Sequence, residues 1–452
     1  MTFHTTRWWK AGVWLAALAG IVTLWVLTAG EDSEWTLWRH YIAGTAAMNI
    51  VWSGAIVLLA YVMTSTRSMA GRLARVVAIS LAASVTLAAL ELPAVVWGHD
   101  YGLTFGTRDN DTWLQLATGI NRYDEELLHV HQPHSQFRGT VGGNLARLGL
   151  PYPARHAVDV RYDRNGFRND VDFTQAEVVA IGDSFVEGAE TPNAQTVVGE
   201  LARRLGLTVV NLGQSNYGPQ QELVVLKRYG TPLSPKAVVW FVFGNDLVDV
   251  DLYEWRRQHL TEYLAPPPLA WRSFTRNALM AIAHLTTPTR RVPTATARRH
   301  EMTFTRADGR REILYLDSPE GPWTAHQWDV LSHTLLDARA LSTNAGAEFL
   351  VVYIPRKQRV YTGAVDAAPD SFARTWVLNN LPQVMGEFCQ EHAIPFLDST
   401  MALRKAVNAG ESVYLPDDVH WNPAGHRVVA AAVAERLQHI VGSPVATSGS
   451  PR

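Results

Sequence analysis

The chain opens with three long apolar stretches. No charged residue occurs from Ala11 to Ala29 or from Ile42 to Met63, and the third stretch, Val76 to Trp97, is interrupted only by Glu91 and Pro93. A helix rises about 1.5 Å per residue, so each stretch is long enough to cross a hydrocarbon core of about 30 Å. The pattern predicts three transmembrane helices. A cleaved signal peptide is the alternative for the first, but its apolar core is too long and no small-residue cleavage site follows it.

Basic residues predict the orientation of these helices, because cytoplasmic flanks are enriched in Lys and Arg. The positive flanks precede the first stretch and separate the second from the third; they contain Arg7, Lys10, Arg67, Arg72 and Arg75. The loop between the first two stretches is mainly acidic, with Glu31, Asp32 and Glu34 against Arg39. We therefore expect a cytoplasmic N-terminus, a membrane domain over residues 1–98 and an extracytoplasmic remainder. Glu91 inside a span is a candidate functional residue.

The pattern of polar, apolar and turn-forming residues predicts four further regions in the rest of the chain. Residues 99–175 are polar and rich in turn formers, which indicates a connecting subdomain. Residues 176–442 alternate short apolar runs with helical patterns, which is typical of a parallel sheet covered by helices. The pattern lapses over residues 250–321, so we expect an insertion there: a cap, a segment on anionic headgroups or a solvated excursion. The Ser/Pro/Gly-rich tail, 443–452, is predicted to be disordered.

The apolar runs give specific elements within residues 176–442. Strands are expected at Val178–Ile181, Thr208–Leu212, Ala237–Phe243, Glu348–Ile354 and Ile394–Leu397. Helices are expected near residues 195–205, 220–228, 328–343 and 378–392. The fold class is therefore α/β, a three-layer α/β/α sandwich with a mainly parallel sheet.

Composition adds mostly exclusions. The 40 Lys and Arg residues balance 42 Asp and Glu residues, so no nucleic-acid partner is indicated. The single cysteine, Cys389, forms no internal disulfide and reads as a small core residue. His129, His131 and His134 lie close together, but no carboxylate or cysteine pattern completes a metal site, so we expect surface or locally packed histidines. We expect neither a metal nor a cofactor.

Two motifs carry candidate nucleophilic chemistry. Gly182, Asp183 and Ser184 directly follow the first strand, at the carboxyl edge where open α/β sheets bind ligands. Asp417 and His420 lie in a polar run before the last helix. A serine hydroxyl needs an imidazole to take its proton, and the imidazole needs a carboxylate to fix its tautomer. Alone, the Gly-Asp-Ser tripeptide is equally typical of a helix cap.

Candidate oxyanion donors follow two other strands. Asn245 comes directly after Ala237–Phe243, and a turn-rich loop, Asn211 to Gly218, follows the second strand. Backbone N–H groups of such a loop, together with an amide side chain, can stabilise developing negative charge.

These blocks, in this order, resemble those of the GDSL/SGNH hydrolase family over about residues 177–442. The resemblance implies a flavodoxin-like fold, Ser184 as nucleophile, His420 as base and Asp417 as its partner. It implies an oxyanion hole built from the N–H groups of Ser184 and Asn216 and the side chain of Asn245. Where the family usually has glycine, this chain has Asn216, which tolerates left-handed backbone angles. Asp418 remains a second possible partner of His420.

The resemblance implies a membrane-anchored serine esterase acting on acyl, and especially O-acetyl, esters of an envelope glycan or lipid. An O-acyltransferase that modifies a cell-surface polysaccharide is the alternative, and an inactive glycan-binding or assembly protein is a second one. Expected partners are an acylated saccharide or lipid, the bilayer and a possible membrane protein. Multi-span anchors on relatives that modify cell envelopes imply the inner membrane, with the catalytic domain in the periplasm.

Overall fold

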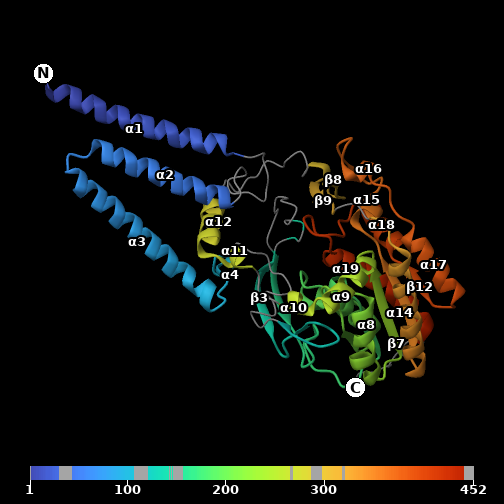
Figure 1. The fold of residues 1–452 in the computed structure, drawn as a ribbon. Coiled ribbons are helices and arrows are strands. Elements are labelled where there is room, and N and C mark those ends of the chain that lie inside the picture. Colours follow the sequence, from blue (N-terminus) through green and yellow to red (C-terminus); the bar gives the residue numbers. More distant parts are fainter. Residues whose placement is uncertain are drawn as a thin grey trace, which may run out of the picture. The chain divides into compact units, whose positions relative to one another are not determined.

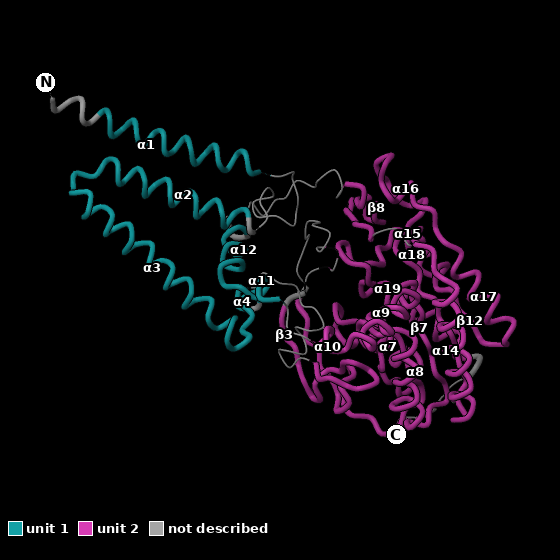
Figure 2. The backbone as a smooth tube through the Cα atoms, in the orientation of Figure 1, with its two compact units in different colours: residues 1–111, 265–291 teal, residues 112–264, 292–452 magenta. Residues whose placement is uncertain are grey.

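The computed structural model describes residues 2–29, 43–105, 121–141, 143, 145, 156–264, 268–286, 298–317 and 321–441. The chain folds into two compact units (Figures 1 and 2). The first, here the membrane unit, contains Met1–Asp111 and Ala265–Arg291. The second, here called the catalytic unit after the predicted nucleophile Ser184 and base His420 that it contains, comprises Thr112–Leu264 and Val292–Arg452. These bounds differ from the expected borders at residues 98 and 175, and they divide the expected insertion between the two units. The expected disordered tail, 443–452, lies outside the described residues.

Three long apolar helices form most of the membrane unit: α1 (Thr2–Leu27), α2 (Ala43–Thr64) and α3 (Met69–Val96). Each is long and apolar enough to cross a membrane, with mean hydropathies of 1.8, 1.8 and 2.0 over the apolar segments. Ser68 caps α3 by accepting a hydrogen bond from the Gly71 N–H at 3.2 Å. The described residues of this unit also form three shorter helices: α4 (Tyr101–Thr104), α11 (Leu269–Arg272) and α12 (Phe274–Thr286).

The catalytic unit is built on a five-stranded parallel sheet in the order β12-β10-β7-β5-β6. The strands are β5 (Val178–Ile181), β6 (Val209–Asn211), β7 (Ala237–Phe243), β10 (Glu348–Ile354) and β12 (Phe396–Asp398). All pairings within this sheet are parallel. Every residue of β5, β6 and β7 is buried, which explains why these strands read as continuous apolar runs.

Two apolar cores lie on opposite faces of this sheet. Alternate strand residues face opposite ways, so Val178 and Val239 join one core while Val179 and Val238 join the other. The first core includes residues of α7 (Val197–Leu205), α18 (Thr400–Asn408) and α19 (Pro423–Val441). The second includes residues of α8 (Pro219–Val225), α14 (Ala325–Asn344) and α17 (Leu381–Glu391). The predicted three-layer α/β/α sandwich is confirmed.

Smaller elements decorate this sandwich. The antiparallel pairs are β1 (Asn121–Arg122) with β2 (Val130–His131), and β3 (Gln136–Val141) with β4 (His156–Arg161). A three-stranded sheet joins β8 (Glu301–Thr305), β9 (Arg311–Tyr315) and β11 (Val365–Asp366). Other α-helices among the described residues are α6 (Ser184–Glu187), α9 (Asp246–Gln258), α10 (Leu260–Tyr263), α15 (Lys357–Tyr361) and α16 (Phe372–Thr375). Short turns of other helix types cover Asn193–Gln195, Leu226–Gly230 and Thr231–Leu233.

The lone cysteine gives a test of the packing of the catalytic unit. Cys389 on α17 is fully buried, and burial raises the pKa of its thiol to about 12. Because the thiolate is the reactive form, we expect a maleimide to leave the folded full-length protein unmodified and to label it after denaturation. A Met401→Cys variant, altered at an exposed position on α18, is the control that reacts in the folded state. Rapid stoichiometric labelling of native Cys389 would contradict this packing.

Candidate active site

The carboxyl ends of three adjacent strands carry the predicted chemistry. In the sheet β5 lies between β6 and β7, so residues that follow these strands emerge at the same edge. Gly182 makes the turn after β5, where a Cβ atom would lie 2.6 Å from Cγ2 of Val186 and 3.1 Å from the Phe241 carbonyl oxygen. Only glycine fits this close approach. Ser184 then begins α6, with Asp183 as its N-cap.

Ser184 and His420 form the contact expected of a nucleophile and its base. Oγ of Ser184 lies 2.7 Å from Nε2 of His420. Nδ1 of the same ring lies 2.6 Å from Oδ1 of Asp418. If the hydroxyl donates to Nε2, the imidazole proton resides on Nδ1 and is donated to Asp418. The three side chains therefore form a continuous hydrogen-bonded chain with the geometry of a catalytic triad.

The carboxylate beside His420 is Asp418, which corrects the expected assignment of Asp417. Oδ1 of Asp418 accepts hydrogen bonds from both the backbone N–H (3.0 Å) and the ring of His420, so the tight turn directs this carboxylate to the imidazole. Asp417 contacts another segment instead: its Oδ2 accepts from the Gly143 N–H at 3.3 Å and its carbonyl from the Leu145 N–H at 3.1 Å. Asp417 lies close enough to His420 in sequence to be its partner. Its side chain points in a different direction from that of the next residue, Asp418, which is the one that reaches the ring.

A second carboxylate faces Nδ1 of His420. Oε1 of Glu190 lies 3.6 Å from that nitrogen. Burial alone lowers the pKa of His420, but the charges of Glu190 and Asp418 outweigh it and raise this pKa. Burial, with the nearby charge of Asp418, also raises the pKa of Glu190. Sequence reasoning missed Glu190, because nothing in its local pattern marks a residue that meets His420 only in the folded chain.

Lys357 holds the loop that carries the base. Its ammonium group is buried and donates to the carbonyl oxygens of Tyr315 (2.9 Å) and Leu415 (2.7 Å). Burial lowers the pKa of Lys357 to about 8, against the opposing influence of Asp418 and Asp417. The bond to Leu415 holds the backbone just before the two aspartates. A buried cation thus helps to position the turn that carries His420.

The predicted oxyanion donors follow the three adjacent strands. Asn216 has a φ of 64°, the left-handed conformation expected where relatives carry glycine. Its loop is tied to the nucleophile turn, because the Gln214 N–H donates to the Gly182 carbonyl at 3.1 Å. Asn245 follows β7, and its Nδ2 donates to Oδ2 of Asp249 at 2.8 Å, which fixes the amide. Burial raises the pKa of Asp183, and a hydrogen bond from the Asn245 side chain opposes that rise.

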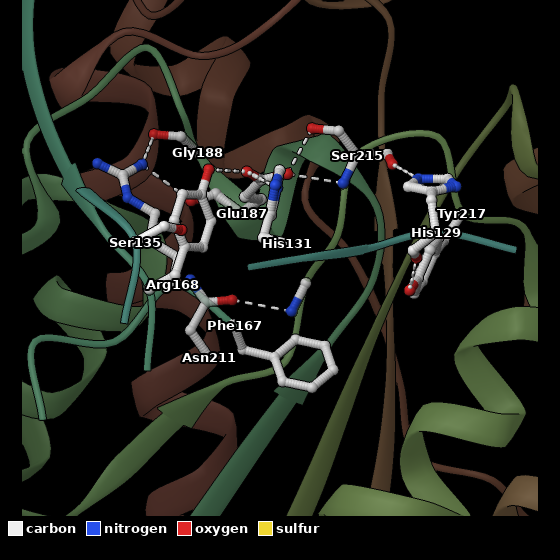
Figure 3. A network of polar contacts seen from close by, with 12 residues as sticks. His129, His131, Ser135, Phe167, Arg168, Glu187, Gly188, Asn211, Ser215 and Tyr217 are labelled. Atoms are coloured by element: carbon white, nitrogen blue, oxygen red, sulfur yellow. Dashed lines mark hydrogen bonds and ion pairs between the residues drawn. The ribbon is translucent and has the colours of Figure 1, made fainter. Parts of the chain in front are cut away.

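A buried network around Glu187 connects α6 to the loop of Asn216 (Figure 3). Oε1 of Glu187 accepts from His131 Nε2 at 3.1 Å and from the Tyr162 hydroxyl at 2.8 Å. Oε2 accepts from the backbone N–H of Ser215 at 2.7 Å and from its hydroxyl at 2.5 Å. Burial opposes ionisation, but His131, Ser215 and Tyr162 outweigh it and lower the pKa of Glu187. One carboxylate thus joins the helix of Ser184 to the residue before Asn216.

The polar segment before β5 is therefore part of the site's framework. His129 Nε2 lies 3.1 Å from the Ser215 carbonyl, and Arg168 donates to the carbonyl oxygens of Glu187 and Gly188. His129 and His131 are buried, which confirms local packing, whereas the His134 side chain is 65% exposed. The segment was expected to be a connection only, because its polar, turn-rich sequence gives no sign of contacts with the nucleophile turn.

Two groups among the described residues bring one histidine and two carboxylates within reach of a single ion. One is Glu190, Asp418 and His420, and the other is Asp251, Glu254 and His326. The histidine of the first group already contacts Ser184, and the second group is at the surface, where His326 lies 3.0 Å from Glu254. Neither arrangement supplies an argument for a resident metal.

Comparison with known proteins gives one family match. Residues 329–448 match the model described as the SGNH hydrolase-like domain of acetyltransferase AlgX. No curated protein matches the chain with significance.

The solved structures that match cover about three fifths of the chain. A GDSL-like lipase from Bacteroides thetaiotaomicron is 12% identical, with a TM-score of 0.30, covering 58% of this chain and 87% of its own. An acetylxylan esterase mutant from Geobacillus stearothermophilus is 14% identical, with a TM-score of 0.31 and coverages of 60% and 96%. An α/β hydrolase from the metagenome of Lake Arreo, Spain, is 14% identical, with a TM-score of 0.32 and coverages of 60% and 97%. At these scores the likeness carries no functional argument. The family match is the informative one: over residues 329–448, which include Asp418 and His420, the chain is similar to an SGNH hydrolase-like domain.

Proposed function

We propose that this protein is a membrane-anchored serine esterase that takes an acyl group from an ester onto Ser184. The observation that carries the proposal is the hydrogen-bonded chain from Ser184 through His420 to Asp418, at the carboxyl edge of a parallel sheet. The substrate class we favour is an O-acetyl or similar ester of an envelope glycan or lipid.

The proposed reaction proceeds in two acyl-transfer steps. Nε2 of His420 takes the hydroxyl proton as Oγ of Ser184 attacks the ester carbonyl, and Asp418 stabilises the imidazolium. The N–H groups of Ser184 and Asn216 and the amide of Asn245 receive the oxyanion. Loss of one such donor typically raises the barrier by about 2.7 to 4 kcal/mol. The imidazolium then protonates the leaving alcohol, and water, activated by the same base, releases the acid.

Transfer of the acyl group to a saccharide hydroxyl is the second candidate. It uses the same residues, with a sugar hydroxyl in place of water as the acceptor. The match of residues 329–448 to the domain model of an acetyltransferase specifically favours this candidate. The charge pattern around α1 to α3 supports an inner-membrane protein with an extracytoplasmic catalytic unit. A membrane-protein partner that supplies the acyl group is compatible with transfer.

The test is acyl release by full-length protein in detergent, because a chain starting at His99 would lose the helices on which α12 packs. We expect wild type to turn over p-nitrophenyl acetate and to be labelled by a fluorophosphonate, and Ser184→Ala to do neither. Mass spectrometry of an added saccharide acceptor separates transfer from hydrolysis. A folded wild type that neither turns over the ester nor becomes labelled would favour the inactive binding protein instead.

The pH profile should report the two carboxylates at His420. A carboxylate near an imidazole stabilises the imidazolium, so Glu190→Gln lowers the pKa of His420. Since the base must be neutral, the acidic limb of kcat/KM should move to lower pH, by about one unit or more. Glu435→Gln, at an exposed position on α19, should leave the limb in place. An unmoved limb in Glu190→Gln would show that Glu190 carries no charge that His420 senses.

The Glu187 network should affect turnover more than binding. In Glu187→Gln an NH2 group replaces one of the two carboxylate oxygens. This donor then faces either the donors of Ser215 or those of His131 and Tyr162, so the hydrogen bonds on that side are lost. Because small displacements of donors cost up to about 100-fold, we expect kcat to fall at least about tenfold with KM little changed. Ser215→Ala keeps the backbone hydrogen bond to Glu187 and should lose less. Full kcat in a folded Glu187→Gln would mean that the loop holds its position without this carboxylate.

A further inference from the structure

A segment inserted into the sequence of the catalytic unit belongs structurally to the membrane unit. Residues 265–291 are grouped with Met1–Asp111, and within them α12 packs against α2, α3 and α4. The packing is apolar: Ala46 and Ala283 are buried against each other, with Trp25, Leu279 and Met280 around them. Trp25 is near the end of α1 and Ala46 is in the first turn of α2. The segment therefore docks at one end of the helices, the end predicted to be extracytoplasmic.

Glu91 fixes this docking through the start of α12. Its Oε1 accepts from the Ser273 hydroxyl at 2.9 Å and the Thr275 N–H at 2.8 Å, while Oε2 accepts from the Phe274 N–H at 3.0 Å. Backbone N–H groups at a helix start lack partners within the helix, and the helix dipole favours a negative charge there. A carboxylate near the end of an apolar helix thus has a structural partner 182 positions later in the chain.

The docked segment keeps an apolar surface exposed. Leu269, Trp271 and Ile282 are 43%, 53% and 48% exposed. From Pro268 to Thr286 the sequence contains Arg272 and Arg276 but no Asp or Glu. The Arg276 guanidinium lies over the Trp271 ring at 4.5 Å. Tryptophan, arginine and aliphatic residues without acids are typical of helices that lie in the headgroup region of an anionic membrane.

We propose that residues 268–286 lie in the outer leaflet at the level of the headgroups, with Leu269, Trp271 and Ile282 in contact with lipid. Continuity supports a bilayer as the occupant, because the helices on which the segment docks expose apolar residues throughout, such as Leu81 and Val95. The proposal rests on the membrane anchoring in the proposed function but not on its chemistry. The proposal concerns the membrane unit alone, to which residues 265–291 belong.

The test is lipid quenching in full-length protein reconstituted into phosphatidylcholine vesicles with 30% phosphatidylglycerol, about the anionic content that attracts basic segments. Ile282→Cys is labelled with a nitrobenzoxadiazole maleimide, and Met401→Cys, on the catalytic unit, is the matched control. The buried thiol of Cys389 leaves the native background unlabelled. We expect lipids with a doxyl group near the headgroup to quench the label at residue 282 at least twice as strongly as the label at residue 401, with iodide showing the reverse.

Two results would overturn the proposal. Equal lipid quenching at residues 282 and 401 would place the segment in water. Protection of residue 282 from both lipid and iodide would mean that protein, such as a second copy of this chain, covers it. None of these readouts requires acyl transfer, so their failure is distinguishable from a failure of the esterase proposal.

Discussion

The hydrogen bond between Ser184 and His420 is the contact on which the catalytic unit depends. It joins residues 236 positions apart, so neither local segment can form it alone. The sheet supplies one side, because β5 ends at the turn of Gly182 and delivers Ser184 to the sheet edge. The last helix and the buried ammonium of Lys357 supply the other side by holding the loop that precedes it. Hydrogen bonds and packing hold both sides, as an oriented nucleophile and base require.

Buried charge is the main physical cost of this arrangement. Asp418, Glu187 and Glu190 lie within one small region, and such carboxylates are expensive to bury unless each is paired or hydrogen-bonded. Glu187 meets this condition with four donors, and Asp418 with the ring and backbone of His420. Glu190 is the least compensated of the three: its Oε1 lies 3.6 Å from Nδ1 of His420, and its side chain is only partly buried, with 19% exposed. Glu187 has four hydrogen-bond donors that stabilise its charge, and Glu190 has weaker compensation. We therefore expect the protonation of Glu190, and not that of Glu187, to be coupled to the protonation of His420.

The sequence predicted most of the framework and part of the site. Features that a local pattern encodes were predicted, and features that depend on contacts between distant segments were not. Strands such as Val178–Ile181 and Ala237–Phe243 were found because a strand buried on both faces must be apolar at every position. Ser184 and His420 were found because their motifs are local. Asp418 was passed over for Asp417, since spacing does not say which side chain a tight turn directs at the ring. Glu187, Glu190 and His131 act through contacts between distant segments, which no periodicity encodes.

Glu91 in the membrane unit is a second example: the sequence singled out this residue but not its partners. An acid in an apolar stretch is a candidate functional residue, and here it accepts hydrogen bonds from the start of α12. The residues that donate to it carry no motif: Ser273 and Phe274 lie in a stretch without a clear hydrophobic pattern. Such docking needs only apolar surface and one half-buried acceptor, so no local motif marks it. Three hydrogen bonds to Glu91 and one apolar contact attach α12 to the membrane unit. All four contacts form only when α2, α3 and α12 are assembled.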